Sequence, residues 1–75
     1  MMNLEVKLFA TLRKPDFQGG IVQLPPEATV RDVVEKMDIP LADVAVILVN
    51  GRHAGPETKL TEGDAISLFP AIAGG

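Results

Sequence analysis

The sequence ends on Leu68-Phe69-Pro70-Ala71-Ile72-Ala73-Gly74-Gly75, and its clearest candidate for chemistry is the terminal carboxylate of Gly75. A terminal carboxyl group has a pKa of about 3.3–3.7, so it is ionised at neutral pH. A carboxylate is a poor electrophile, but its oxygen can attack the α-phosphorus of ATP to form a mixed anhydride, which is a good acyl donor. Two residues without side chains let the backbone before this group enter a narrow channel. The alternative is that the last residues are only a frayed end.

The other candidate groups favour structural roles. His53 is the single histidine, and the sequence places no serine or cysteine nucleophile beside it. Glu62 and Asp64 flank Gly63, which is typical of a turn. Gly19-Gly20 is not followed by the Lys-Ser/Thr of a phosphate-binding loop. We therefore predict no independent active site and no protein-built metal site.

Composition narrows the class of protein further. The chain has 75 residues, a net charge of −3 and no cysteine, so we expect one domain without disulfides. Its seven basic residues are scattered, which gives no basis for nucleic-acid binding. The longest apolar run, Val44–Val49, is far too short to span a membrane. No basic-then-apolar leader precedes the first strand, so a cytoplasmic location is expected.

Periodicity and turn signals predict five strands. The first alternates apolar and polar residues, which places Leu4, Val6 and Leu8 on one face and Phe9 on the other. The third strand, Val44–Val49, is continuously apolar and is therefore predicted to be buried on both faces. The strands are expected at Leu4–Phe9, Ile21–Leu24, Val44–Val49, Arg52–Ala54 and Ala65–Phe69, and Asn50-Gly51 is expected to turn the third into the fourth.

One helix is predicted between the second and third strands. Thr29 can cap its start, and Asp32 stands three residues later, in an aspartate variant of the capping box. Its apolar residues recur at the spacing of one helical face, and they are Val30, Val33, Val34 and Met37. Pro40 ends the helix at or before Ile39. Leu60, alone in a polar loop, is expected to plug the core under the sheet.

The order strand–strand–helix–strand–strand–strand predicts an α+β fold in which one helix covers one face of a mixed sheet of four to five strands. A right-handed crossover would put the third strand beside the first and parallel to it. This is the β-grasp arrangement of ubiquitin-like proteins, in which the last strand lies beside the first. We expect a domain over residues 1–70 and a flexible tail over 71–75, since Pro70 cannot donate to a strand ladder.

Four stretches of the sequence stand in a succession that is typical of one family. They are Val6–Arg13, Val49-Asn50-Gly51, Leu60–Asp64 and Phe69–Gly75. These stretches resemble the MoaD/ThiS group of sulfur carriers, which comprises the small subunit of molybdopterin synthase and the sulfur carrier of thiamin thiazole synthesis. The resemblance spans nearly the whole chain, and the turn, last strand and terminal Gly-Gly in fixed succession carry most of it.

The resemblance implies a sulfur carrier that is a co-substrate rather than an enzyme. An E1-like adenylating enzyme would use ATP to activate the carboxylate of Gly75, and sulfur from a persulfide would then convert it to a thiocarboxylate. The tail would enter a larger catalytic subunit that builds the dithiolene of molybdopterin, the precursor of the molybdenum or tungsten cofactor. No cofactor would be bound by the chain itself.

We expect the partner contacts to come from the tail and from two phenylalanines. Phe9 and Phe69 both fall on the sheet face opposite the helix if the first and last strands are neighbours. Either ring could instead pack under a loop of its own domain. The expected partner-binding residues are Phe9, Phe69, Pro70, Ile72, Ala73 and Gly74, and Gly75 is the reactive residue.

Other functions fit the same tail. The carrier could serve thiamin thiazole synthesis or another sulfur-transfer pathway, since Ile72–Gly75 also resembles the thiazole-type ending. Ala71 stands where molybdopterin-type carriers often have a second proline. A ubiquitin-like modifier would join Gly75 to a lysine of a target protein, although the tail lacks an arginine of the kind that ubiquitin has. A plain interaction module would be unaffected by loss of Gly74 and Gly75.

Overall fold

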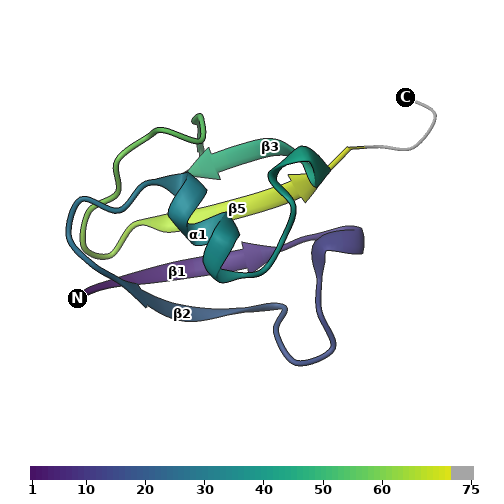
Figure 1. Cartoon of the computed structure of the whole chain (residues 1–75), viewed down its shortest axis with the longest axis horizontal. Coiled ribbons are helices and arrows are strands. Elements are labelled where there is room, and N and C mark those ends of the chain that lie inside the picture. Colours follow the sequence, from purple (N-terminus) through teal and green to yellow (C-terminus); the bar gives the residue numbers. More distant parts are fainter. Residues whose placement is uncertain (72–75) are drawn as a thin grey trace.

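A computed structural model describes residues 1–71 of the chain as a five-stranded sheet covered on one face by a single helix (Figure 1). The strands are β1 (Met2–Leu8), β2 (Gly19–Leu24), β3 (Val44–Val49), β4 (Arg52–His53) and β5 (Ala65–Pro70), and the helix is α1 (Val30–Lys36). Two short 3₁₀ turns lie at Ala10–Leu12 and Leu41–Asp43. Of the predicted tail, only Ala71 lies within the described residues.

The strand order β2-β1-β5-β3-β4 confirms the predicted β-grasp fold. β1 pairs antiparallel with β2 and parallel with β5, while β3 pairs antiparallel with β5. The expectation that the third strand lies directly beside the first and parallel to it is wrong. β5 enters the sheet between them, and β3 runs antiparallel to β5 and therefore to β1. β5 is hydrogen-bonded on both sides and is the centre of the sheet, and its inward residues Ile66 and Leu68 have no exposed surface.

The helix forms as predicted and ends slightly before the expected limit. At its start the Asp32 carboxylate accepts a hydrogen bond from the backbone N–H of Thr29 at 2.8 Å, which completes the predicted cap. At its end Asp38 takes a positive φ of 59°, a conformation that leaves the helical path. Within residues 1–71 no helix is long and apolar enough to cross a membrane.

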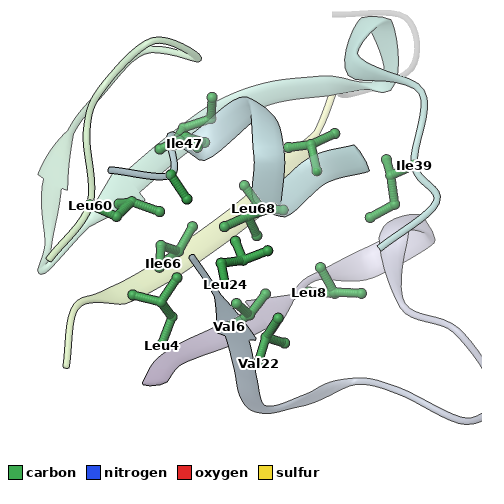
Figure 2. Close-up of a cluster of buried hydrophobic side chains, with 14 of the residues drawn as sticks. Leu4, Val6, Leu8, Val22, Leu24, Ile39, Ile47, Leu60, Ile66 and Leu68 are labelled. Atoms are coloured by element: carbon green, nitrogen blue, oxygen red, sulfur yellow. The ribbon is translucent and has the colours of Figure 1, made fainter. Parts of the chain in front are cut away.

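The core lies between the helix and the inward face of the sheet (Figure 2). The inward residues of β1, which are Leu4, Val6 and Leu8, are at most 2% exposed. The apolar face of α1 meets them, and Leu60 closes the cluster from its loop as predicted. Burying one such side chain contributes about 1.5–3 kcal/mol. This one-sided core therefore supplies most of the hydrophobic stabilisation of the domain.

β3 differs from its prediction, because it is not buried on both faces. Only Ile47 is buried, Ala45 is exposed, and the remaining residues of the strand are half-buried. The physical reason is that a single helix covers one face of the sheet and no other described element covers the second (Figure 1). A continuously apolar strand in such a sheet therefore leaves apolar side chains at the surface.

Candidate functional site

The predicted site residues divide at Ala71. Phe9, Phe69 and Pro70 are described by the structure, whereas Ile72, Ala73, Gly74 and Gly75 lie outside the described residues. β1 and β5 run parallel, so their C-terminal ends lie at the same end of the sheet. Phe9 directly follows β1 there, and Phe69 lies near the end of β5. The chain leaves β5 at this edge and continues toward the C-terminus (Figure 1).

Phe9 and Phe69 form a stacked aromatic pair on the face opposite the helix. The register of β1 and β5 places Leu8 beside Leu68, and the Phe9 N–H donates to the Leu68 carbonyl at 3.1 Å. The two ring centroids are 4.3 Å apart with an interplanar angle of 12°. Both phenylalanines were predicted to share this face, and that placement is confirmed.

The aromatic pair is only partly covered by its own domain. Phe9 remains 36% exposed. Phe69 is half-buried, and it lies opposite Val46 of β3. The alternative in which one ring is packed away under a loop is therefore wrong for Phe9.

An open groove extends from Phe69, the inner member of the aromatic pair, across β3 to β4. Leu48 lies in it between Ser67 of β5 and His53 of β4, because the pairing registers place these three residues side by side. Almost every other lining side chain is apolar, and His53 is the one ionisable residue among them. The lining residues are Ala10, Ala45, Val46, Leu48, His53, Phe69, Pro70 and Ala71.

Sequence reasoning missed the contribution of β3 to this groove. Val46 and Leu48 alternate with the buried Ile47 and therefore belong to the outer face. The signal was present in the sequence, since a sheet with one helix can bury only one face of a fully apolar strand. Pro70 and Ala71 line one end of the groove, and Ala71 immediately precedes in sequence the residues that include the terminal glycines.

At the opposite end of the strands, the acidic turn before β5 is hydrogen-bonded to the β3–β4 turn. Asn50 Nδ2 donates to Asp64 Oδ1 at 2.9 Å, and Asn50 Oδ1 accepts from the Ala65 N–H at 2.9 Å. Asp64 Oδ2 also accepts from the Thr61 N–H at 2.8 Å. The hydrogen bond from the Thr61 backbone, followed by that from Asn50, holds the pKa of Asp64 below its usual range.

The neighbouring carboxylate has a separate role in the same turn. Glu62 Oε1 accepts from the Asn3 N–H at 3.0 Å, and the Gly63 N–H donates to the Asn3 carbonyl at 2.8 Å. The two carboxylates therefore bind backbone and side-chain donors of the fold, as the interpretation of this stretch as a turn predicted. Asn50 and Gly51 have φ values of 53° and 82°, which confirms the predicted two-residue turn.

The described residues offer a binding surface rather than a set of catalytic groups. His53 is exposed. Within residues 1–71, no cluster of three or more His, Cys, Asp or Glu side chains could hold a metal ion. An apolar groove beside a partly exposed aromatic pair is suited to contact with another protein.

Comparisons with known proteins were made for the whole chain. A model of the ThiS family matches residues 6–75. Small archaeal modifier protein 3 of Haloferax volcanii is 34% identical over an alignment that covers 99% of this chain and all of that protein. A protein of Archaeoglobus fulgidus whose name proposes a sulfur carrier is 30% identical, with the same coverage of both chains.

The structure is also similar to that of a protein from Pyrococcus furiosus. Its name proposes subunit 1 of the molybdopterin converting factor. The TM-score is 0.76 and the identity is 27%, and the match covers 96% of this chain and all of the other. The similarity therefore extends over the whole domain and does not rest on a local motif.

Proposed function

Since the chain belongs to the ThiS family, a group of small sulfur carriers and ubiquitin-like modifiers, we propose that it carries sulfur on the C-terminal carboxylate of Gly75. In this proposal the chain is a protein co-substrate, and its partners supply the catalytic groups. It binds no cofactor of its own, and ATP is used by the activating enzyme.

The proposed chemistry takes place in two steps. A carboxylate oxygen of Gly75 attacks the α-phosphorus of ATP, which forms the acyl adenylate and releases pyrophosphate. A persulfide sulfur on a donor protein then attacks the acyl carbon, and AMP leaves. Cleavage of the sulfur–sulfur bond of this acyl persulfide by a thiol leaves the thiocarboxylate on Gly75 and a disulfide between the thiol and the donor.

The observation that carries this proposal is the groove that runs from Phe69, Pro70 and Ala71 across β3 to β4, with Phe9 stacked on Phe69 beside it. A partner that holds the last residues in an enclosed site must restrict their backbone, which costs about 1–2 kcal/mol per residue. Affinity must therefore come from elsewhere on the domain. The apolar groove lies beside the exit of the tail, where it can supply that affinity.

In this proposal the expected partner-binding residues act together. Phe9 and Phe69 contact the partner through the open face, and Pro70 ends the strand so that the tail can leave the sheet. Ile72 is the one large apolar side chain of the tail, and Ala73 and Gly74 pass through the narrow entrance.

We assign the carrier to molybdopterin synthesis. The similarity to the P. furiosus protein supports this assignment, as does the resemblance of Val6–Arg13 to the first strand of molybdopterin-type carriers. The partners would be an adenylating enzyme and a larger catalytic subunit that accepts the sulfur. A carrier for thiamin thiazole synthesis would have the same chemistry at Gly75 with a different acceptor.

A second candidate function is that of a ubiquitin-like modifier. The similarity to small archaeal modifier protein 3 favours it, since that protein is named as a modifier. The adenylation step would be shared, but the acceptor would be a lysine amine instead of a persulfide. Conjugates of the chain with other proteins in a cell extract, joined through Gly75, would support this function.

The first experiment is an intact-mass measurement after incubation with ATP, an activating enzyme and a sulfur source. We expect a mass gain equal to the replacement of one oxygen by sulfur, located at Gly75, and no gain in the chain that lacks Gly75. A control carrier shows that the enzyme is active. No gain in the full chain, or an equal gain in the truncated chain, would contradict the sulfur-carrier function.

The groove is tested separately with Phe69→Asp. This charge at the end of the groove should raise the KM for adenylation of the chain while the circular dichroism spectrum stays that of the folded domain. Ile21→Asp is the matched control, since Ile21 is 65% exposed on the same face but lies on β2, opposite Glu5. Equal effects of the two variants would show that the groove is not the contact surface.

A further inference from the structure

Asn50-Gly51 is a sequence in which an asparagine amide can react with the next backbone nitrogen. Glycine lacks a side chain, so its nitrogen can approach the preceding amide carbon without steric hindrance. A side chain built at Gly51 would meet no heavy atom within 4 Å, which shows that this turn is open to solvent. Among the described residues, no backbone hydrogen bond engages the Gly51 N–H outside the regular strands. The nucleophile is therefore available.

The electrophile is held by the fold. Both polar atoms of the Asn50 amide are engaged, one by Asp64 Oδ1 and the other by the Ala65 N–H, each at 2.9 Å. These partners lie at the start of β5, whereas Gly51 leads into β4. β5 and β4 flank β3 on opposite sides, so the amide is fixed on the side away from the strand that the Gly51 nitrogen enters.

We propose that Asn50-Gly51 is a deamidation site that the hydrogen bonds of the Asn50 side chain keep closed in the folded protein. The site opens when the β3–β4 turn separates from the start of β5. This proposal concerns the chain itself and does not depend on the sulfur-carrier function.

Deamidation needs no co-reactant other than water. The deprotonated Gly51 nitrogen attacks Cγ of Asn50, which forms a carbon–nitrogen bond and expels ammonia as the Cγ–Nδ2 bond breaks. Water then opens the five-membered imide at either carbonyl and gives aspartate or isoaspartate. Hydroxide promotes the first step by deprotonating the nitrogen, so the rate rises with pH.

The products would disrupt the contact that protected the site. An aspartate at position 50 would place an acceptor oxygen against Asp64 Oδ1, where the amide nitrogen now donates. Two adjacent carboxylates repel each other and raise the cost of keeping both ionised. An isoaspartate would lengthen the backbone of a two-residue turn and shift the Val49–Arg52 pairing. Modification would therefore loosen the hairpin that carries Leu48 and His53 of the groove.

The rate should follow the free energy of local opening. If reaction requires the turn to open, each 1.4 kcal/mol of opening free energy slows it about tenfold. We expect deamidation at Asn50 in the folded protein to be at least about tenfold slower than in the same protein unfolded in urea at equal pH and temperature. Equal rates in the two states would overturn the proposal.

Variants of the turn locate the protection. Asp64→Ala removes the acceptor of the Asn50 amide and should speed deamidation of the folded protein about fivefold, the factor for one hydrogen bond worth about 1 kcal/mol. Asp64→Asn keeps one acceptor oxygen, which can serve either Asn50 Nδ2 or the Thr61 N–H, and should react at a rate between those of the wild type and Asp64→Ala. Glu62→Ala is the matched control, because Glu62 binds Asn3 and not Asn50.

The assay is peptide mapping by mass spectrometry over days at mildly alkaline pH, with circular dichroism to confirm that each variant is folded. Asn3, which precedes Leu4, serves as an internal reference for a hindered site. Faster reaction at Asn50 in Asp64→Ala than in Glu62→Ala supports the proposal. Equal rates in these two variants would overturn it. If Asp64→Ala fails to fold, an Asp64→Asn variant that reacts no faster than Glu62→Ala would do the same.

Discussion

The contact between Phe9 and Phe69 can be measured as a coupling energy in the isolated domain. Full burial of a phenylalanine side chain contributes about 1.5–3 kcal/mol, so Phe9, which is 36% exposed, should contribute about 1–2 kcal/mol by burial alone. A favourable aromatic pair adds about 0.5–1.5 kcal/mol beyond burial. Because this pair is partly open to water, we expect a coupling of about 0.5–1 kcal/mol.

The assay is a double-mutant cycle in urea with Phe9→Ala, Phe69→Ala and the double variant. Phe9→Ala should lower the free energy of unfolding by about 1.5–3 kcal/mol, the sum of the burial and pairing contributions. In a domain of this size, each 1 kcal/mol lowers Tm by about 4–8 °C. The sum of the stability losses in the two single variants should exceed the loss in the double variant by the coupling energy.

A second cycle provides the control. Ile21 lies opposite Glu5, four residues before Phe9 on β1, so it is about 13 Å along the strand from that ring. Phe9→Ala and Ile21→Ala should therefore be additive. A coupling of zero between Phe9 and Phe69, or an equal coupling in the control pair, would refute the stacked arrangement and with it the shape of the groove.

Three further predictions concern the fold that presents the groove. Leu68→Ala should lower the free energy of unfolding by about 2–5 kcal/mol in a urea titration, since Leu68 is fully buried at the centre of the sheet. Asp32→Ala should cost about 0.5–2 kcal/mol through loss of the cap on Thr29, and Glu35→Ala on the exposed face of α1 should change stability by less than about 0.5 kcal/mol. Hydrogen bonds from the Thr61 backbone and the Asn50 side chain hold the pKa of Asp64 in the folded chain below its ordinary value of 3.8. The contribution of ionised Asp64 to the free energy of unfolding is therefore fully present above pH 3.8 and is lost as the pH falls through the folded pKa. The wild type should thus lose more stability than Asp64→Asn between neutral pH and about pH 3. Parallel losses in the two proteins would contradict that assignment.

Local rules were sufficient for the elements of this protein. The helix start follows from Thr29 and Asp32, whose side-chain and backbone groups lie within one turn of each other. The turn at Asn50-Gly51 follows from the two positive φ values that a tight hairpin requires. Alternation along β1 specifies which face is buried, because successive side chains of a strand point to opposite sides. Each of these depends on residues close in sequence.

The arrangement of the groove depended on contacts that no local rule contains. The insertion of β5 between β1 and β3 decided that Phe9 and Phe69 stack and that Val46 lies opposite Phe69. The apolar run of β3 predicted burial, but whether both of its faces are covered depends on how many helices the whole chain supplies. Tertiary structure alone also joined Asn50 to Asp64, which are fourteen residues apart. The sequence by itself determined the elements and predicted the reactive terminus, while the packing of one helix on one face decided which apolar side chains remain on the open face.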